Sequence, residues 1–353
     1  MKYLSKIFCI LLLSLLFFSC NKSEKIPAIY LPAEGGFYEA WQKVIPQISD
    51  SFGKKIEIRQ YKSPEEFGRI IKQADRYNML AAEVPVTGSY HLALYAKDGL
   101  FTELNIRRDY FVPSLFDSVI SAFYAKQDTQ NKSHYYALPF SFDVLINIKP
   151  NFVIQGKSDF IYSLPGSKAD VDIAFLAALM QKENLTLSSA LSKLKDYSND
   201  DTLQLNPFTY TLNDSLQMVL SGTASSMPVF FSDYYSIKPQ YLDQIEIEKI
   251  DTAYTVNATC LVFPKSKHNS KNSEINKLAA ILYEPEIMYT SASSRNWIPA
   301  RIDTVSKNFL AEKVKNQMRY VKGCTISGLI YSSEKEKQAL YDDIRRSLTT
   351  RTR

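Results

Sequence analysis

Residues 28–97 alternate between strand-like and helix-like segments, and this alternation constrains the fold more than any other feature of the chain. The strand-like runs lie at 28–31, 55–61 and 78–84. Ser63 begins the helix after the second run, because Pro64 follows in the first turn and Glu66 lies three residues after Ser63. The order strand, helix, strand, helix, strand predicts an α/β fold with a parallel sheet covered by helices.

The pattern changes after residue 101, because a long extended segment follows a helix predicted at 109–125. This segment covers residues 135–147 and holds Pro139 near its middle, where a proline fits poorly with one central strand. We therefore expect a strand that crosses between two domains and bends at the proline. Further helices are expected at 36–52, 169–195, from 213 to Gly222, at 274–284, at 306–321 and from Ser333, and a short strand is expected at 227–231.

The first residues predict export. Two lysines precede Ile7–Phe18, an almost wholly apolar run that is too short for a membrane span of about 20 residues and is typical of a secretory signal. Ser19 and Cys20 follow, and this resembles a bacterial lipoprotein signal, although Phe17 and Phe18 replace the usual leucine and small residue. We expect residues 1–19 to be removed and Cys20 to carry a lipid. A simple anchor helix and a cleaved signal with an incidental cysteine are the alternatives.

The expected mature chain, residues 20–353, is too long for one ordinary hydrophobic core and predicts two domains. An apolar content of 45% and a charged content of 22% are ordinary for a globular protein. The net charge of +5 is too small to indicate a nucleic-acid partner. The arginines near the end of the chain are typical of a solvated helix end.

Cysteine and histidine usage argues against a metal site. Cys260 and Cys324 remain after the signal, and they could form a disulfide or stay free, as the geometry of the fold decides. Two cysteines and three scattered histidines make a zinc site unexpected. The chain also lacks the sequence motifs of zinc proteases, nucleotide-binding loops and serine hydrolases. We expect no metal, no cofactor and no enzyme, with a hydrolase whose groups meet only in space as the alternative.

Four stretches, taken in order, carry a resemblance to a known family. They are residues 94–104, 135–147, 220–227 and 280–301. The first stretch is similar to a helix end that closes a small domain in that family, and the second to the family's first interdomain crossing. The third is similar to a turn ahead of a short strand, and the fourth to a late helix with the loop before Pro299. Together they resemble the extracellular solute-binding proteins of ABC transporters, which include maltose-binding and other sugar-binding lipoproteins.

The resemblance implies a two-lobed, periplasmic-binding-protein-like α/β fold with crossing strands, a hinge, and a ligand cleft between the lobes. The implied N-terminal lobe holds 20–139 and about 256–285, and the C-terminal lobe holds 140–255 and about 286–353. Phe140–Asp143 and Thr252–Val256 are the hinge candidates.

Sugar sites combine aromatic rings, which stack on the ligand, with carboxylates and amides, which bind its hydroxyls. By the resemblance, the aromatic residues after the 227–231 strand and before Pro299 fall where family members stack a ligand ring. The expected ligand-binding residues are Trp297, Phe231, Tyr234, Tyr235, Glu83, Tyr90, Glu34 and Asp143. The alternatives are core packing for the aromatic residues, a helix cap for Glu83 and an interlobe salt bridge for Asp143. Trp41 is expected in the core.

The resemblance implies an exported receptor, anchored through the lipid on Cys20 (a fatty acid such as palmitate) and facing the periplasm or the cell surface. The receptor would capture a small solute, a carbohydrate first, and deliver it as a monomer to an ABC permease. The low glycine count, 11 residues, leaves an alternative open: a surface lipoprotein of the same fold that binds a protein or another non-sugar ligand. An aromatic patch outside the cleft would favour that alternative.

Overall fold

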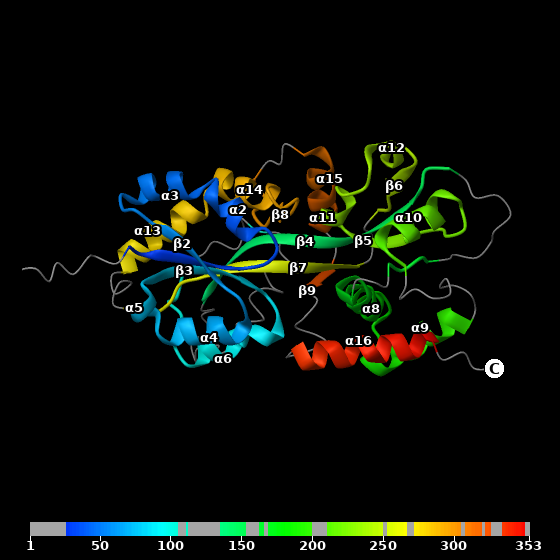
Figure 1. Ribbon diagram of the computed structural model, residues 1–353, viewed down its shortest axis with the longest axis horizontal. Helices are drawn as coiled ribbons and strands as arrows, with labels where there is room; N and C mark the ends of the chain where they lie inside the picture. The colour runs from blue at the N-terminus through cyan, green and yellow to red at the C-terminus, as the bar shows by residue number, and fades with distance from the viewer. Residues whose placement is uncertain are drawn as a thin grey trace, which may run out of the picture.

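A mixed β-sheet organises the chain, and nine strands of it lie in the described residues (Figure 1). The computed structural model describes residues 26–104, 111, 135–152, 162–165, 169–199, 210–249, 253–266, 272–304, 308–319, 322–325 and 334–349. The strands are β1 (Ala28–Pro32), β2 (Glu57–Tyr61), β3 (Met79–Pro85), β4 (Ala137–Pro150), β5 (Met227–Phe230), β6 (Ile245–Ile247), β7 (Ala253–Val262), β8 (Ile298–Pro299) and β9 (Lys322–Thr325). Their order is β2-β1-β3-β7-β4-β5, with β6 and β8 paired to β4 and β9 to β7.

The first three strands are parallel, as the sequence predicts, because β1 pairs in parallel with both β2 and β3. β7 is antiparallel to β3 and to β4, so β3 and β4 run in the same direction. Pro85 at the end of β3 lies opposite Thr259, and Thr259 lies opposite Ser141 on β4. Beyond this point β4 continues to Pro150 and pairs with β5 and β6. The carboxyl ends of β1–β3 therefore face the half of the molecule that contains β5 and β6.

Helices cover both faces of the sheet (Figure 1). In the N-terminal half they are α2 (Phe37–Gln42), α3 (Ile45–Phe52), α4 (Pro64–Lys72), α5 (Ala74–Tyr77), the 3-10 helix η1 (Gly88–Tyr90) and α6 (Leu92–Lys97). The later helices are α8 (Ala169–Glu183), α9 (Leu187–Asn199), α10 (Leu212–Leu220), α11 (Phe231–Tyr234), α12 (Pro239–Leu242), α13 (Asn272–Leu282), α14 (Pro285–Ser293), α15 (Phe309–Met318) and α16 (Glu334–Thr349). In Figure 1, α2, α3, α13 and α14 lie on one face of β1–β3, and α4–α6 lie on the other.

Two predicted helices are each divided in the structure. The helix predicted at 36–52 is interrupted at residues 43–44, because Pro46 occupies the first turn of α3 and cannot donate a hydrogen bond to a preceding turn. The helix predicted at 169–195 separates into α8 and α9, and Asn184 between them has a positive φ of 54°. The start at Ser63 is confirmed, since its side chain accepts a hydrogen bond from the backbone N–H of Glu66 at 3.2 Å.

β4 passes through Pro139 as one continuous central strand, which differs from the expectation that a proline excludes such a strand. The pairing of β4 with β7 shifts register between Pro139 and Ser141, so the proline sits beside a β-bulge. A bulge leaves a residue unpaired and tolerates the missing proline N–H. The carbonyl of Phe140 accepts a hydrogen bond from Ala300 at 3.0 Å, which fixes the bulge against the segment after β8. The predicted irregularity at the proline is therefore present as a bulge.

Two clusters of buried residues form the hydrophobic core. The larger one packs β1–β4, β7 and their covering helices, and it extends to α10 and α11. The smaller one joins α8, α9 and α16 with Leu145 of β4 and Phe230 of β5. α14 packs against α2 and α13, which belong to the predicted N-terminal lobe. The lobe boundaries given above, including the one near residue 286, stay a prediction.

Several predictions concern residues outside the described ranges. Cys20 and the signal lie there, as does the helix predicted at 109–125 apart from Phe111. No helix in the described ranges is both long enough and apolar enough to cross a membrane. Cys260 is buried and its thiol is free, so it forms no disulfide in this structure. Burial raises the pKa of this thiol well above its ordinary value.

Candidate functional site

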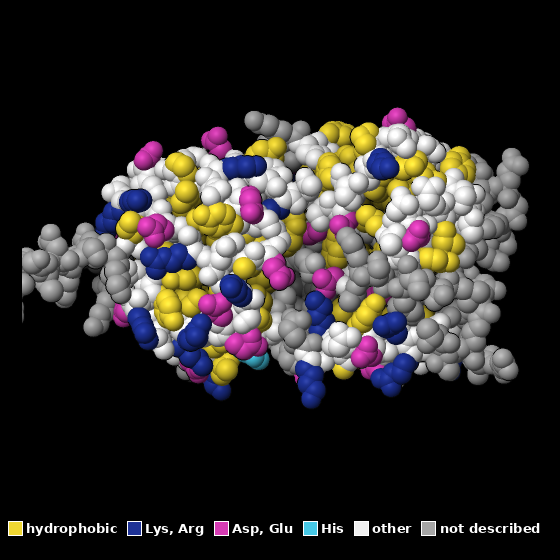
Figure 2. Space-filling view, in the orientation of Figure 1, with side chains coloured by type: hydrophobic (Ala, Val, Ile, Leu, Met, Phe, Trp, Pro, Cys, Tyr) yellow, Lys and Arg dark blue, Asp and Glu magenta, His cyan; other side chains and the backbone are white. Residues whose placement is uncertain are grey.

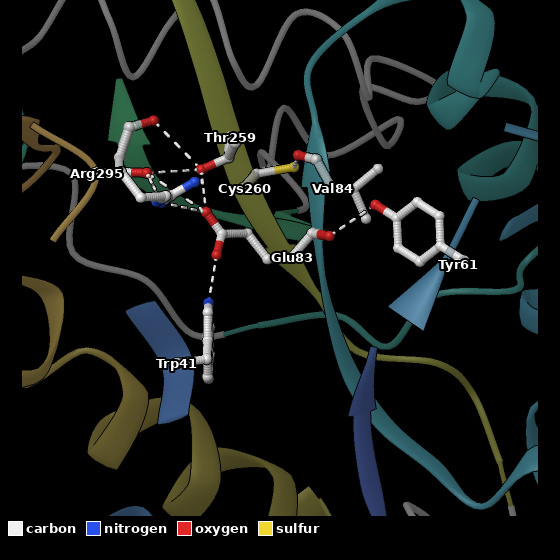
Figure 3. Close-up of polar contacts among 8 residues, drawn as sticks. Trp41, Tyr61, Glu83, Val84, Thr259, Cys260 and Arg295 are labelled. Atoms are coloured by element: carbon white, nitrogen blue, oxygen red, sulfur yellow. Dashed lines mark hydrogen bonds and ion pairs between the residues drawn. The ribbon is translucent and has the colours of Figure 1, made fainter. Parts of the chain in front are cut away.

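Glu83, at the end of β3, is fully buried and lies at the centre of a polar cluster (Figure 3). Trp41 on α2 donates its indole N–H to Oε2 of Glu83 at 2.5 Å. Oε1 of Glu83 accepts from Thr259 Oγ1 at 2.6 Å and from Arg295 Nη2 at 2.9 Å. With Ser141, these residues form what we call the Glu83 cluster: Trp41, Glu83, Ser141, Thr259 and Arg295. Segments far apart in sequence therefore meet on one carboxylate.

Ser141 attaches the bulge of β4 to this cluster. Its hydroxyl oxygen accepts a hydrogen bond from Arg295 Nη2 at 2.8 Å and lies 2.9 Å from Thr259 Oγ1. The same hydroxyl lies 3.4 Å from Oε1 of Glu83. The first hinge candidate, Phe140–Asp143, thus contains a residue hydrogen-bonded to the buried ion pair. Whether β4 acts as a hinge there stays a prediction.

Arg295 follows α14, and its side chain is 2% exposed. Its guanidinium carbon lies 4.0 Å from the ring centroid of Phe37 and 4.7 Å from that of Trp297. The two rings meet edge to face at 6.2 Å, so the guanidinium occupies the angle between them. Nε and Nη1 of Arg295 are buried and have no hydrogen-bond partner among the described residues. The Glu83 carboxylate, the Ser141 hydroxyl and two aromatic rings therefore hold this cation.

The loop after β1 approaches the same place. Gly35 and Gly36 both have left-handed backbone conformations, with φ of 82° and 69°, which glycine adopts without strain. A Cβ on Gly36 would lie 3.8 Å from Arg295 Cγ, and a Cβ on Gly35 would lie 3.0 Å from the Phe37 ring. Glu34, which precedes these glycines, is exposed. This predicted ligand residue is thus exposed and lies three residues before Phe37.

A second set of predicted residues gathers around α11. Asp143 of β4 is 4% exposed, and its carboxylate accepts hydrogen bonds from the backbone N–H of Ser232 at 3.0 Å and from its hydroxyl at 2.5 Å. Burial raises the pKa of Asp143 to about 7. Phe231 and Tyr234 are also buried, and Tyr235 is half-buried. Asp143 therefore joins β4 to α11 through its hydrogen bonds with Ser232.

The aromatic rings of α11 pack mainly on one another. Tyr235 meets Phe231 edge to face at 5.2 Å and Tyr234 at 5.8 Å, and its hydroxyl accepts a hydrogen bond from Asn308. Phe231, at 1% exposure, offers no ring face to solvent in this structure. Core packing, the alternative reading of these residues, accounts for Phe231 and Tyr234 here, and a part in ligand binding stays a prediction.

Tyr90 lies apart from both groups. It is half-buried and packs against Tyr61 and Phe67 at centroid distances of 6.0 Å and 5.8 Å. Tyr61 in turn donates its hydroxyl to the backbone carbonyl of Glu83 at 2.8 Å (Figure 3). Burial raises the pKa of Tyr61 well above its ordinary value, so it remains a neutral donor.

The structure thus unites Glu83 and half-buried Trp297 through Arg295, a residue that the sequence analysis did not select. Ser141 and Thr259 were missed as well. The sequence offers one signal for Arg295, its position two residues before the loop tryptophan. An arginine at such a position is equally common in an exposed loop, so this signal does not indicate burial. Trp41 is fully buried, as predicted, but its indole N–H also orients the carboxylate.

A surface pocket of about 410 Å³ lies between α4 on one side and η1 and α6 on the other. Glu65, Arg69 and Lys72 line it from α4, and Ser89, His91 and Tyr95 line it from the facing segments. None of the predicted ligand residues lines this pocket. The pocket lining combines apolar surface with polar side chains of both charges, so it does not indicate one ligand class.

Gly68 also lines this pocket, and it gives a test of the packing of α4. A Cβ on Gly68 would lie 2.2 Å from the Tyr95 hydroxyl oxygen, and Tyr95 is 6% exposed. Gly68→Ala is therefore expected to destabilise the protein by about 1–2 kcal/mol, since overpacking outweighs the gain in helix propensity. In a Tyr95→Phe background, which removes the clashing oxygen and leaves the ring carbon Cζ at 3.3 Å, the same change should destabilise the protein less. Urea denaturation of the four proteins measures this coupling, and equal effects of Gly68→Ala in both backgrounds would contradict it.

The described residues contain no group of three or more His, Cys, Asp and Glu side chains placed to hold a metal ion. Basic and acidic side chains are interspersed over the face shown in Figure 2, and no broad region of it carries one sign. Such a surface gives this face no electrostatic match to a polyanion.

The fold of the chain is similar to that of known proteins. No family model matches the chain, and no curated protein sequence matches it. The solved structure of the bacterial solute receptor AcbH, which prefers β-D-galactopyranose, has a TM-score of 0.67 at 10% identity, covering 92% of each chain. RafE from Streptococcus pneumoniae has a TM-score of 0.61 at 12% identity, covering 92% of this chain and 98% of RafE.

An extracellular solute-binding protein from Staphylococcus aureus, solved with maltose, has a TM-score of 0.61 at 11% identity, covering 93% of this chain and 97% of that one. At these identities the likeness concerns the fold. The chain therefore has the two-lobed α/β fold of solute-binding proteins, as the sequence predicts.

Proposed function

We propose that the protein is an exported receptor that binds a small carbohydrate between its two lobes. The observation that carries this proposal is the likeness in fold, along more than nine tenths of the chain, to receptors that bind galactopyranose, raffinose and maltose. The aromatic corner formed by buried Phe37 and half-buried Trp297 supports it, because a partly exposed indole ring beside polar groups suits the apolar face and hydroxyls of a sugar.

The expected mode of action is binding without chemistry. A solute that contacts both lobes stabilises the closed arrangement only through contacts that the open arrangement lacks. We further propose that Cys20 carries the lipid anchor, that the receptor faces the periplasm or the cell surface, and that it delivers its solute to an ABC permease. The residues expected above to bind the ligand are proposed for that role here as well, and Trp297 is the strongest candidate among them.

The alternative is a surface lipoprotein that binds a protein. An exposed aromatic patch would support it, and the described residues form none. The exposed large apolar side chains there are Leu94, Phe152 and Phe309, and they belong to separate segments. Singly exposed apolar residues are normal on soluble proteins.

A thermal-shift screen of the soluble chain from Asn21 tests the proposal, with sugars, oligosaccharides, amino acids, peptides and polyamines as ligands. A saccharide that binds the folded state should raise its stability by about 2.7 kcal/mol at a hundredfold excess over the dissociation constant. Trp297→Ala should weaken its binding at least about tenfold, because the stacking face is lost. Phe152→Ala, which removes an exposed aromatic ring elsewhere, should bind as wild type. Melting shifts with amino acids or polyamines alone would contradict the sugar assignment.

A further inference from the structure

The backbone around Trp297 is held on both sides. The backbone N–H of Trp297 donates to the carbonyl of Ala292 at 2.9 Å, which closes the end of α14. The next residue, Ile298, pairs with Phe142 in the β4–β8 ladder. The backbone is therefore fixed at both sides of the tryptophan, but these contacts leave the ring free to rotate about its side-chain bonds.

The ring of Trp297 is oriented by Phe37 and Arg295. Phe37 meets it edge to face at 6.2 Å, and the guanidinium of Arg295 lies 4.7 Å from its centroid. Arg295 is itself immobilised, because Nη2 donates to Glu83 at 2.9 Å and to Ser141 at 2.8 Å. A cation over an aromatic ring is attracted by the negative charge of the ring face, and the attraction is largest where water is excluded.

We propose that Arg295 is a positioning residue, which fixes the ring of Trp297 as the platform on which the sugar stacks. This inference rests on the proposed function for the identity of the ligand, but the orientation of the ring can be measured without ligand. Arginine suits the position better than lysine, since a planar guanidinium donates hydrogen bonds in its plane while its face contacts rings. A lysine ammonium at the same place keeps the charge for Glu83 and loses the planar contact.

The chain provides a selective probe of this ring. It contains two tryptophans, and Trp41 is fully buried while Trp297 is half-buried. Quenching of tryptophan fluorescence by iodide, which stays in water, should therefore report on Trp297. Affinity for the sugar found in the screen gives the second readout, which a residue that served stability alone would leave unchanged in folded protein.

Arg295→Lys is the test variant, and Arg301→Lys is its matched control. Arg301 also stacks on an aromatic ring, that of Tyr283 at 4.4 Å, and also pairs with a carboxylate, that of Asp303. We expect Arg295→Lys to increase iodide quenching and to weaken sugar binding about tenfold, because the planar contact that orients the Trp297 ring is lost. Arg301→Lys should leave both readouts at wild-type values.

Ser141→Ala gives an independent test if Arg295→Lys does not fold. It removes one hydrogen-bond acceptor of Arg295, so it should shift quenching and affinity in the same direction by a smaller factor. Wild-type quenching and affinity in a folded Arg295→Lys protein would overturn the inference. If wild-type protein binds no sugar while Arg295→Lys still increases quenching, the proposed function fails and the positioning role stands.

Discussion

Replacing Glu83 with alanine is expected to lower the free energy of unfolding by about 3–5 kcal/mol. The carboxylate is fully buried and accepts hydrogen bonds from Trp41, Thr259 and Arg295. Its removal leaves a buried guanidinium without a counter-charge, and two nitrogens of that guanidinium already lack partners among the described residues. Urea denaturation of the soluble chain measures the change.

Glu274→Ala is the matched control for this prediction. Glu274 also pairs with a cation, Lys54 at 3.3 Å, but both side chains are substantially exposed. An exposed pair contributes about 0–1 kcal/mol, so this variant should be nearly as stable as wild type. A loss of under about 1 kcal/mol for Glu83→Ala would mean that water or a rearranged partner compensates Arg295, and the cluster would not be a stabilising centre of the fold.

Asp172→Asn is expected to stabilise the protein by about 2–4 kcal/mol at pH 8 and to have little effect near pH 4. Asp172 of α8 is 1% exposed, and neither carboxylate oxygen has a hydrogen-bond partner among the described residues. Burial raises its pKa from 3.8 to about 7, with Arg345 opposing the shift. At this carboxyl the folded state therefore keeps a proton that the unfolded chain loses between about pH 4 and 7, so the contribution of Asp172 to stability should fall as pH rises through this window.

Asp170→Asn, two residues away on the same helix, separates burial from helix position. Asp170 is 54% exposed and pairs with Lys337 at 2.7 Å, so its neutralisation should change stability by under about 1 kcal/mol. Denaturation at pH 4, 6 and 8 compares the two variants with wild type. Asp143 has a similarly raised pKa, so a smaller pH dependence should remain in Asp172→Asn. A pH profile identical to that of wild type would show that Asp172 is paired or hydrated.

The sequence predicted the architecture well where local signals agree with tertiary packing. The spacing of strands and helices in residues 28–97 gave the parallel order of β1–β3, and the Ser63 cap has the expected geometry. The break between α2 and α3 has a local signal in Pro46, which outweighs the helical spacing of the apolar residues at 36–52. The continuity of β4 through Pro139 could not, because the bulge depends on contacts with β7 and the segment after β8.

The candidate site was only partly predictable, since it depends on contacts across more than two hundred residues. Glu83 was selected as a carboxylate at a strand end, and its partner Arg295 lies 212 positions away. No local pattern marks that arginine as buried. Phe231, by contrast, was selected by family resemblance, and its burial follows from the packing of α11 on β4.

Isothermal titration calorimetry of the soluble chain with the saccharide found in the screen tests the central claim most directly. The account predicts saturable binding at one site per chain, at least about tenfold weaker in Trp297→Ala and unchanged in Phe152→Ala. Circular dichroism confirms that each protein is folded. Folded wild-type protein that binds no mono- or oligosaccharide, or whose binding survives Trp297→Ala intact, would contradict the account.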